Sequence, residues 1–252
     1  MGSLRKNDVL SVIRSEGKAS VEALADHFDV TVQTIRRDLT ELEAEGKIAR
    51  VHGGATIRSG VTNIEYDERR NWMADAKEAI AGLLASHVPD NTSLFVNIGT
   101  TTEAVARELL DHENLTVLTN NMNVANIMAA NQSCEVTVSG GVLRRSDGGL
   151  VGDIAIQMIE QFKVDIAIIG ASALDEDGDL LDYDIREVGV SRAIIRNARR
   201  VFLVADHTKF ERTAPVRIAS LGEVDAIFTD HALPGSLAAK CNSWNTSVHV
   251  VA

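Results

Sequence analysis

Residues 30–39, VTVQTIRRDL, place two adjacent arginines in a pattern that is typical of a short helix. Thr31 can cap this helix with its hydroxyl, and Gly46 can end it because glycine adopts the left-handed conformation at little cost. The apolar residues at helical spacing, which predict the buried stripe of this helix, are Ile35, Leu39 and Leu42. The segment therefore predicts an amphipathic helix that starts after Thr31 and ends before Gly46.

Two further helices precede this segment, and a hairpin follows it. Residues 4–16 have helical spacing, with Gly17 placed to end the helix, and Ser20 can cap a second helix that runs to Phe28. Residues 47–57 read as two extended arms around His52-Gly53-Gly54, which suits a tight turn. Helix, helix, tight turn, helix and hairpin is the order of a winged helix-turn-helix, whose third helix fits the major groove of DNA.

The polar face of the third helix has the side chains that DNA recognition requires. At 100° per residue, Gln33, Arg37 and Thr40 lie opposite the apolar stripe, with Arg36 at the edge. Arg37 is the candidate to read a guanine, whereas Arg36 and Arg50 are placed to hold phosphates. Taken alone, IRRDL also fits a solvated helix face with an Arg–Asp pair. The predicted DNA-binding residues are Thr31, Gln33, Thr34, Arg36, Arg37, Thr40, Arg50, His52 and Gly53.

Charge separates this N-terminal region from the rest of the chain. Residues 1–58 contain nine basic and nine acidic residues, so the remaining chain, with 16 basic and 27 acidic residues, carries the whole net charge of -11. An acidic bulk repels polyanions, so we expect DNA contacts to be confined to residues 1–58. Residues 59–74 lack periodicity and predict a linker, and residues 75–252 predict a second domain.

The composition is that of a globular protein of the cytosol. Of the 252 residues, 45% are apolar and only three are proline, and no apolar run is long enough for a signal peptide or a membrane span. Cys134 and Cys241 are isolated and form no Cys-x-x-Cys pair, which fits a reducing compartment. We therefore expect a soluble, cytoplasmic protein.

Strand-like and helix-like segments alternate through the second domain. Helices are expected at residues 75–88, 102–111, 123–131 and 186–198. Strands are expected at residues 93–99, 115–119, 135–141, 164–171, 200–206, 224–230 and 247–252. Apolar strands that alternate with helices indicate an α/β fold, with a parallel sheet covered on both faces.

Polar loops follow three of these strands, and ligands bind at such strand ends in α/β folds. Gly99-Thr100-Thr101-Thr102 runs directly into a helix, and TNN (119–121) and SGGVLRRSDGG (139–149) follow two other strands. Glycine lets a ligand approach the backbone, and a helix N-terminus binds anions. Each loop alone could simply cap or turn, but three together favour a small phosphorylated ligand. The cationic candidates for this anion site are Arg144, Arg145 and Lys209.

Other chemistries lack their motifs. No G-x-G-x-x-G, P-loop or G-x-S-x-G occurs, and no histidine pair has zinc-motif spacing. LDEDGDLLDYD (174–184) lacks the spacing of a calcium loop and predicts an acidic turn and a strand. Cys134 precedes a strand and is expected to be an inert, packed thiol. We therefore expect no metal, no cofactor and no catalytic residue.

The sequence resembles the DeoR family of bacterial transcription regulators over essentially its whole length. VTVQTIRRDLTELEAEGKIARVHGGA resembles the family's N-terminal signature, and NIGTTTEAVA, TNNMNVAN, SGGVLRRSDGGLVG and VADHTKF resemble its sensor domain. The resemblance implies an oligomeric repressor that releases operator DNA when a phosphorylated sugar or polyol binds, with glycerol 3-phosphate favoured. It also implies a sensor fold similar to ribose-5-phosphate isomerase. The effector site that it implies comprises Gly99, Thr100, Thr101, Thr102, Asn120, Asn121, Gly140, Gly141, Asp184, Glu187 and Lys209.

Two alternatives remain open at this point. A sugar-phosphate isomerase needs a carboxylate base, and the isomerases carry Asp-Gly-Ala-Asp where this chain reads Gly170-Ala171-Ser172-Ala173. Glu187 remains, but a lone carboxylate also fits a ligand hydroxyl. An architectural DNA-binding protein without a ligand would leave the three strand-end loops unexplained.

Overall fold

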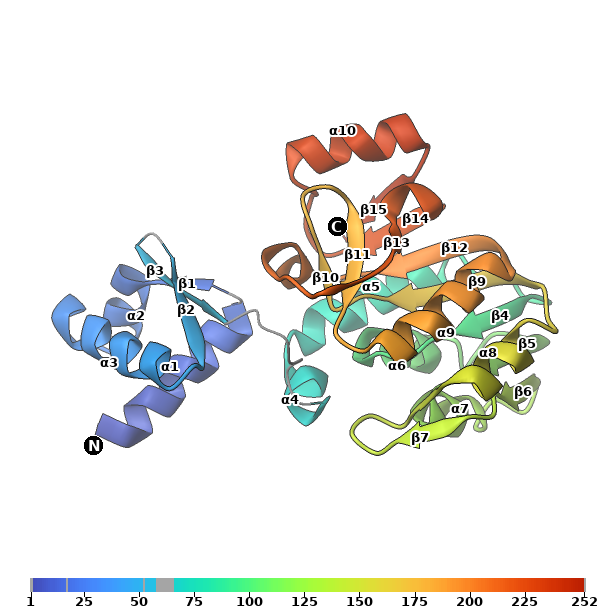
Figure 1. The fold of residues 1–252 in the computed structure, drawn as a ribbon, viewed down its shortest axis with the longest axis horizontal. Helices are drawn as coiled ribbons and strands as arrows, with labels where there is room; N and C mark the ends of the chain where they lie inside the picture. Colours follow the sequence, from blue (N-terminus) through green and yellow to red (C-terminus); the bar gives the residue numbers. More distant parts are fainter. Residues whose placement is uncertain (1, 17, 52, 58–65, 252) are drawn as a thin grey trace. The chain divides into compact units, whose positions relative to one another are not determined.

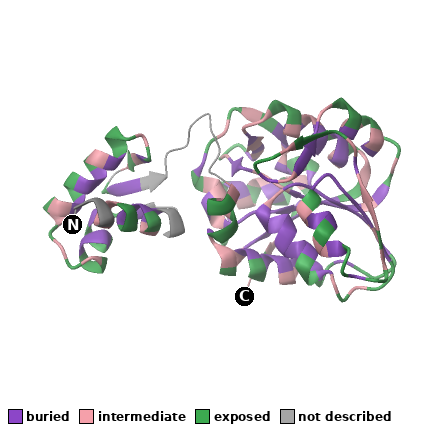
Figure 2. Cartoon of the chain, turned by 90° about the horizontal axis from the view of Figure 1, so that it is seen from below, coloured by how far each residue is buried: buried purple, intermediate pink, exposed green. Residues whose placement is uncertain are grey.

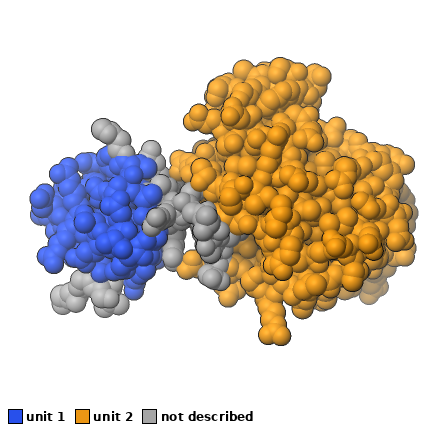
Figure 3. Space-filling model, viewed as in Figure 1, with its two compact units in different colours: residues 1–62 blue, residues 63–252 orange. Residues whose placement is uncertain are grey.

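The computed structural model describes residues 2–16, 18–51, 53–57 and 66–251 of the 252-residue chain. The chain divides into two compact units, residues 1–62 and residues 63–252 (Figures 1 and 3). Each unit has a buried core of its own.

The first unit has the expected order of elements and one further strand. Strand β1 pairs with β3, so the predicted hairpin is part of a three-stranded sheet with the order β1-β3-β2. The elements are α1 (Gly2–Glu16), β1 (Lys18–Ser20), α2 (Val21–His27), α3 (Val32–Ala44), β2 (Ile48–Val51) and β3 (Gly54–Ile57). The winged helix-turn-helix is therefore confirmed as the fold of this unit, whereas Gly17 lies outside the described residues.

Local chemistry accounts for the helix boundaries. The Ser20 hydroxyl accepts a hydrogen bond from the Ala23 amide at 3.0 Å, and the Thr31 hydroxyl accepts one from the Thr34 amide at 3.3 Å. Gly46 follows α3 with a φ of 73°, the left-handed conformation expected of it. The stripe of α3 is fully buried, with 0% exposure at Ile35, Leu39 and Leu42.

Gly54 has a different role from the one its sequence suggests. It lies in β3 and not in the turn, and a Cβ at this position would overlap the carbonyl oxygen of Ala19 in β1. Glycine is therefore required for the close approach of β1 and β3. The turn itself contains Gly53, whose φ is 76°.

The second unit is built on a seven-stranded parallel sheet with the order β15-β14-β12-β9-β4-β5-β6. All seven strands coincide with segments that the sequence predicts. They are β4 (Ser93–Val96), β5 (Leu115–Thr119), β6 (Cys134–Val138), β9 (Val164–Gly170), β12 (Ala198–Val204), β14 (Ala226–Thr229) and β15 (Ser247–Val250).

Helices cover both faces of this sheet, and the strands between them are largely buried (Figures 1 and 2). One face packs on α5 (Ala74–Ala85), α6 (Thr100–Glu108) and α7 (Met122–Met128). The other packs on α8 (Asp153–Ile159), α9 (Ile185–Arg196) and α10 (Gly235–Trp244). Alternate residues of the central strands enter the two cores, as the period of two requires.

Several elements were not expected from the sequence. These include β7 (Val142–Arg144) and β8 (Gly149–Val151), which form a hairpin. They also include β10 (Ala173–Leu174) and β13 (Val216–Ser220), which flank β11 (Asp179–Asp182) in an antiparallel sheet. Two 3₁₀ turns, η1 (His207–Glu211) and η2 (Leu221–Glu223), follow β12 and β13. Residues 174–184 form the expected acidic turn and strand, in which Asp175 accepts the amides of Asp177 and Asp179.

The predicted linker, residues 59–74, extends into the second unit. Residues 59–65 lie outside the described part of the chain, whereas α4 (Tyr66–Asn71) is helical and Trp72 is buried. Among the helices of the described residues, none has the length and apolarity that a bilayer crossing requires.

Candidate functional site

The exposed face of α3 carries the predicted DNA-binding side chains. Gln33, Arg36, Arg37 and Thr40 are exposed on α3, as are Arg50 on β2 and Gly53 in the turn. Thr31 is exposed at the cap and Thr34 is half-buried, with their hydroxyls 2.9 Å apart. Arg37 has an 83% exposed side chain, which contacts only Glu41, at 3.3 Å, among the described residues. His52 lies outside the described residues.

In the second unit, a pocket lies at the carboxyl ends of β4, β9 and β12. Its wall includes the Gly99–Thr102 loop, Gly170–Ser172 after β9, and Lys209 after β12. Asp182 from β11, Glu187 from α9 and Arg69 from α4 complete the wall. The pocket therefore occupies the position where parallel α/β folds bind ligands.

The Gly99–Thr102 loop opens α6 and points its backbone into the pocket. Gly99 has a φ of 152°, which favours glycine, and it precedes a helix of nine residues. The Thr102 hydroxyl donates to the carbonyls of Asn97 and Gly99, at 2.7 and 2.8 Å, so this threonine acts as a structural cap. Thr100 and Thr101 line the pocket beside the free amides of the helix N-terminus.

Cations gather beside this loop around one buried carboxylate. Lys209, Lys77 and Arg212 all act electrostatically on Asp206, which is 2% exposed. Burial lowers the pKa of Lys209 to about 7, with Arg212 adding to the effect and Asp206 opposing it. Burial likewise lowers the pKa of Lys77 to about 8. The cluster therefore has more cationic groups than carboxylates and can hold an anion.

Arg212 forms no ion pair among the described residues, although the Asp206 carboxylate acts on it electrostatically. It is 7% exposed, and its Nε and Nη2 atoms are buried without a hydrogen-bond partner in the described part of the chain. Its guanidinium lies over the Trp72 ring, 4.1 Å from the ring centroid. Burial lowers the pKa of Arg212 to about 10. Unpaired buried donors of this kind are costly without a partner, which a bound anion would provide.

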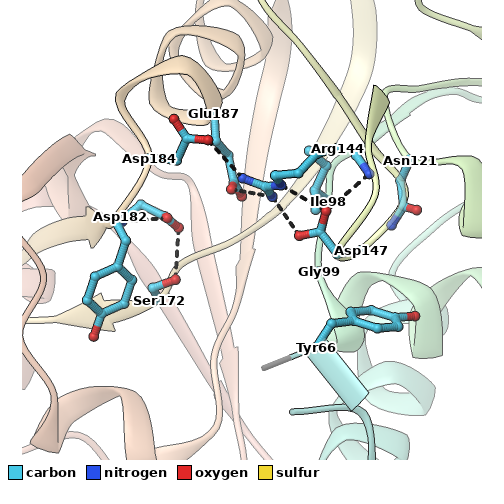
Figure 4. A network of polar contacts seen from close by, with 12 residues as sticks. Tyr66, Ile98, Gly99, Asn121, Arg144, Asp147, Ser172, Asp182, Asp184 and Glu187 are labelled. Carbon is cyan, nitrogen blue, oxygen red and sulfur yellow. Dashed lines mark hydrogen bonds and ion pairs between the residues drawn. The ribbon is translucent and has the colours of Figure 1, made fainter. Parts of the chain in front are cut away.

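The opposite wall of the pocket is acidic (Figure 4). Asp182 accepts a hydrogen bond from the Ser172 hydroxyl at 2.9 Å, and Glu187 lies 2.6 Å from Arg144. Burial raises the pKa of Glu187 to about 8, and the Asp182 carboxylate adds to this while Arg144 opposes it. Two neighbouring carboxyl groups on one wall suit the hydroxyls of a ligand, since they can accept or donate hydrogen bonds.

Arg144 belongs to the acidic wall and not to the cation cluster around Asp206, contrary to what its position in the sequence suggests. Its guanidinium donates to Asp147 at 2.8 and 2.6 Å, and it also contacts Asp184 at 3.3 Å and Glu187 at 2.6 Å (Figure 4). Burial favours the neutral form, but these carboxylates raise the pKa of Arg144 above its ordinary value. Arg144 therefore neutralises and positions the acidic wall. Arg145, its neighbour, is exposed.

The remaining residues that the resemblance implies serve the framework around the pocket. Asn121 caps α7 by accepting from the Asn123 amide, and its side-chain nitrogen donates to Glu103 at 3.1 Å. Asn120 donates to the Leu150 carbonyl, and Asp184 caps α9. A Cβ on Gly141 would lie 2.8 Å from the Val151 carbonyl oxygen, and one on Gly140 would lie 3.0 Å from Ile154. These residues hold the loops, but none belongs to the lining of the pocket.

Sequence reasoning missed Arg69, Lys77, Asp182 and Arg212. One of them left a signal, because Lys77 falls on the apolar stripe of α5 with Ile80, Ala81 and Leu84, and a lysine on such a stripe indicates a buried ammonium. Arg69 and Asp182 reach the pocket from α4 and the antiparallel sheet, and Arg212 reaches the cation cluster from the end of η1; the sequence did not predict that these elements meet.

One group of residues resembles a metal site only in its distances. His207, Asp230 and His231 bring potential ligand atoms within 4.8 Å of one another. The two imidazole Nδ1 atoms lie 2.6 and 3.1 Å from the same Asp230 oxygen, which are hydrogen-bond distances. His231 is exposed. The arrangement is that of one carboxylate shared by two imidazoles.

A winged helix-turn-helix followed by a pocket-bearing α/β unit defines a ligand-responsive DNA-binding regulator. Comparison with known proteins agrees, since the DeoR-like helix-turn-helix domain matches residues 5–60 and the DeoR C terminal sensor domain matches residues 72–231. The chain belongs to the DeoR family.

Its relatives include named repressors. The chain is 44% identical to the glycerol-3-phosphate regulon repressor of Escherichia coli (strain K12), over 92% of each chain. It is 45% identical to the repressor of the same name from Haemophilus influenzae, over 90% of this chain and 89% of that one. It is 38% identical to the HTH-type transcriptional repressor CsqR of Escherichia coli, over 95% and 92%. A solved D-ribose-5-phosphate isomerase in complex with phospho-erythronic acid gives a TM-score of 0.42, at 12% identity over 54% of each chain.

Proposed function

We propose that this protein is a cytoplasmic transcriptional repressor that releases its operator on binding a phosphorylated sugar or polyol, with glycerol 3-phosphate as the favoured effector. It controls an operon of carbon catabolism. It acts as a homo-oligomer, a dimer or a tetramer, on repeated or palindromic half-sites. The names of its relatives support the class of function, and its own pocket supports the class of effector.

The observation that carries the effector assignment is the bipolar pocket. A phosphate would lie against the N-terminus of α6, where Thr100, Thr101 and Lys209 all line the pocket. Hydroxyl groups fit against Asp182 and Glu187 on the acidic wall. Glycerol 3-phosphate has a phosphate at one end and two hydroxyls at the other, which is the polarity that the pocket presents.

In the first unit, we assign base reading to the exposed face of α3. Arg37 contacts a guanine, and Arg36 and Arg50 contact phosphates. The supporting contacts come from the cap, the helix and the tip of the wing, namely Thr31, Gln33, Thr34, Thr40, His52 and Gly53. Apart from the half-buried Thr34, the described members of this set are exposed, which supports the assignment.

The alternative function is that of an isomerase. The lack of an acid in Gly170–Ala173 argued against it, and the structure weakens that argument. Although Gly170–Ala173 contains no acid, Asp182 reaches the same place from β11 and bonds Ser172. The pocket therefore does contain carboxylates. The regulator reading is favoured because the chain has a DeoR-type helix-turn-helix and its named relatives are repressors.

The experiment has two stages. First, the purified protein selects its binding sequence from a pool of random DNA; salt-dependent retention without sequence enrichment would favour an architectural protein. Second, thermal unfolding is followed with glycerol 3-phosphate, ribose 5-phosphate, inorganic phosphate and glycerol. A ligand at 100 times its dissociation constant adds about 2.7 kcal/mol to the free energy of unfolding. We expect glycerol 3-phosphate to stabilise the protein and to release the selected DNA, and glycerol to do neither. Absence of stabilisation by every phosphorylated compound would contradict the proposal.

A further inference from the structure

One residue that lines the effector pocket comes from the segment that follows the DNA-binding unit in the sequence. Helix α4 is the first described element after residues 58–65, and Arg69 on this helix lines the pocket. Its side chain is 16% exposed. A pocket residue on this helix places ligand contact only a few residues from the chain that leads to the DNA-binding unit.

The contact between Arg69 and Asp147 is the weaker of two that Asp147 makes with arginines. Arg69 Nη2 lies 3.6 Å from Asp147 Oδ2, beyond the range of a good hydrogen bond. Arg144 binds both oxygens of the same carboxylate, at 2.8 and 2.6 Å. Asp147 would thus remain neutralised by Arg144 if the guanidinium of Arg69 moved away.

An anion in the pocket could lie closer to the Arg69 guanidinium than Asp147 does. Lys209, Lys77 and Arg212 surround Asp206 beside it, and Arg69 adds to the positive potential that acts on all three cations. The Nε and Nη2 atoms of Arg212, which are buried and find no hydrogen-bond partner among the described residues, are a second sign that this region is built for an anion. Repulsion among these cations is relieved when a phosphate enters, because each then gains an opposite charge.

Side chains of neighbouring helices hold α4 at its start and near its end. At its start, the Tyr66 hydroxyl donates to Glu103 of α6 at 2.7 Å and accepts from Asn123 at 3.0 Å. At its end, the Lys77 ammonium donates to the carbonyls of Arg69 and Trp72. Lys77, which holds the end of α4, therefore also belongs to the cation cluster that an anion would reorganise.

We propose that Arg69 is both an effector ligand and the switch of this repressor: its guanidinium leaves Asp147 for the anionic group of the bound effector, and the shift of α4 that follows reports occupancy to the DNA-binding unit. This inference rests on the proposed function of the pocket. It adds a ligand that the sequence did not indicate and a route from the pocket to the DNA.

The test separates binding from release in one variant. In Arg69→Gln, the backbone carbonyl that Lys77 binds is retained, so the fold should survive, which thermal unfolding without ligand verifies. Loss of a charge-assisted hydrogen bond should weaken the binding of glycerol 3-phosphate, measured by calorimetry, about 10-fold to 100-fold. Effector at saturation weakens operator binding by about 5-fold to 150-fold in typical allosteric proteins. In Arg69→Gln the ratio of the operator dissociation constants with and without saturating effector should fall close to one.

Arg70→Gln is the matched control, because Arg70 is exposed on the same helix and does not line the pocket. This variant should bind effector and release operator as the wild-type protein does. Arg69→Lys keeps the charge and should recover part of both effects. The inference is overturned if Arg69→Gln binds effector like wild type, or if it binds weakly but releases operator fully at saturation. If the wild-type protein itself binds no phosphorylated compound, the proposed function fails, and the inference fails with it.

Discussion

Arg5 on α1 binds Asp38 on α3 through two hydrogen bonds, at 2.7 and 3.1 Å. Asp38 is 4% exposed, so the acidic residue next to the arginine pair points into the unit and is neutralised there. A solvated helix face would pair Asp38 with an arginine of IRRDL itself. Asp38 instead binds Arg5 of α1, so that alternative does not explain this residue. Arg36 and Arg37 remain on the exposed side, with Arg37 in contact only with Glu41 at 3.3 Å among the described residues.

Replacement of Arg37 should affect DNA reading and leave stability nearly unchanged. Arg37→Ala should cost about 1–3 kcal/mol of operator affinity and relax base preference at one position of each half-site. Its exposed pair with Glu41 contributes little to folding. Binding of the selected operator and of its single-base variants measures both effects. As a contrast, Ile35→Ala should lower the free energy of unfolding by about 2–5 kcal/mol, because Ile35 is fully buried. A folded Arg37→Ala protein with wild-type operator affinity would contradict the assignment of this face.

The repeating elements of the fold could be predicted from the sequence, because their signals are local. Ser20, Thr31 and Gly46 mark helix ends through the hydrogen bonds and φ values that they adopt. The seven strands of the parallel sheet are apolar runs, since both faces are covered. Strand β1 was not predicted because three residues are too few to show a pattern. The one sequence feature that depends on β1 is Gly54, which packs against it but is also typical of a turn.

The pocket was only partly predictable because distant segments build it. The Gly99–Thr102 loop and Lys209 follow strands of the predicted sheet, so their meeting could be expected. Asp182 depends on the pairing of β11 with β10 and β13, which no local pattern specifies. Arg69 lies in a stretch that lacks periodicity. Conversely, Arg144 was predicted to bind the anion but forms ion pairs with carboxylates, two of which come close to it only in the tertiary structure.

The carboxylates of the pocket should bind and not catalyse. Relatives of this chain that align over nearly its whole length are named repressors, so we expect no isomerisation of ribose 5-phosphate or of the bound effector. Exchange of solvent deuterium into bound ligand, followed by NMR, is the sensitive measurement, since a general base would abstract a carbon-bound proton. Incorporation that depends on the protein and disappears in Glu187→Gln would establish an enzyme instead.

Lys209 should be required for sensing but not for DNA binding. The Lys209→Ala protein should bind operator normally, because the residue lies in the second unit. It should need about 10-fold to 150-fold more effector for release, since a charge-assisted hydrogen bond contributes about 1.5–3 kcal/mol. Titration of operator release against effector measures the shift. An unchanged midpoint in the folded variant would show that the ammonium is not an effector ligand.

Trp72 should report effector binding through its fluorescence. Its ring stacks on the Arg212 guanidinium at 4.1 Å and is 9% exposed, so a change in the partners of Arg212 alters the surroundings of the indole. The chain has two tryptophans, and Trp244→Phe leaves Trp72 as the only one. We expect saturable emission changes on addition of glycerol 3-phosphate, with the midpoint that calorimetry gives. A spectrum that does not change at saturating effector would place Arg212 outside the anion cluster.

Effector affinity should fall as the pH rises above about 7. In the ligand-free pocket, burial lowers the pKa of Lys209 to about 7, and the cations Arg212, Lys77 and Arg69 face it together with Asp206. A bound phosphate stabilises the ammonium form and raises this pKa, so binding above pH 7 takes up a proton and weakens by up to about tenfold per pH unit. Below about pH 6 the phosphate itself gains a proton, so affinity should be greatest between about pH 6 and 7. Calorimetry at pH 8 in buffers of different ionisation enthalpy should show net proton uptake. Lys209→Arg, which keeps its charge over this range, should lose most of the uptake, whereas equal uptake in the two proteins would assign the proton to another group.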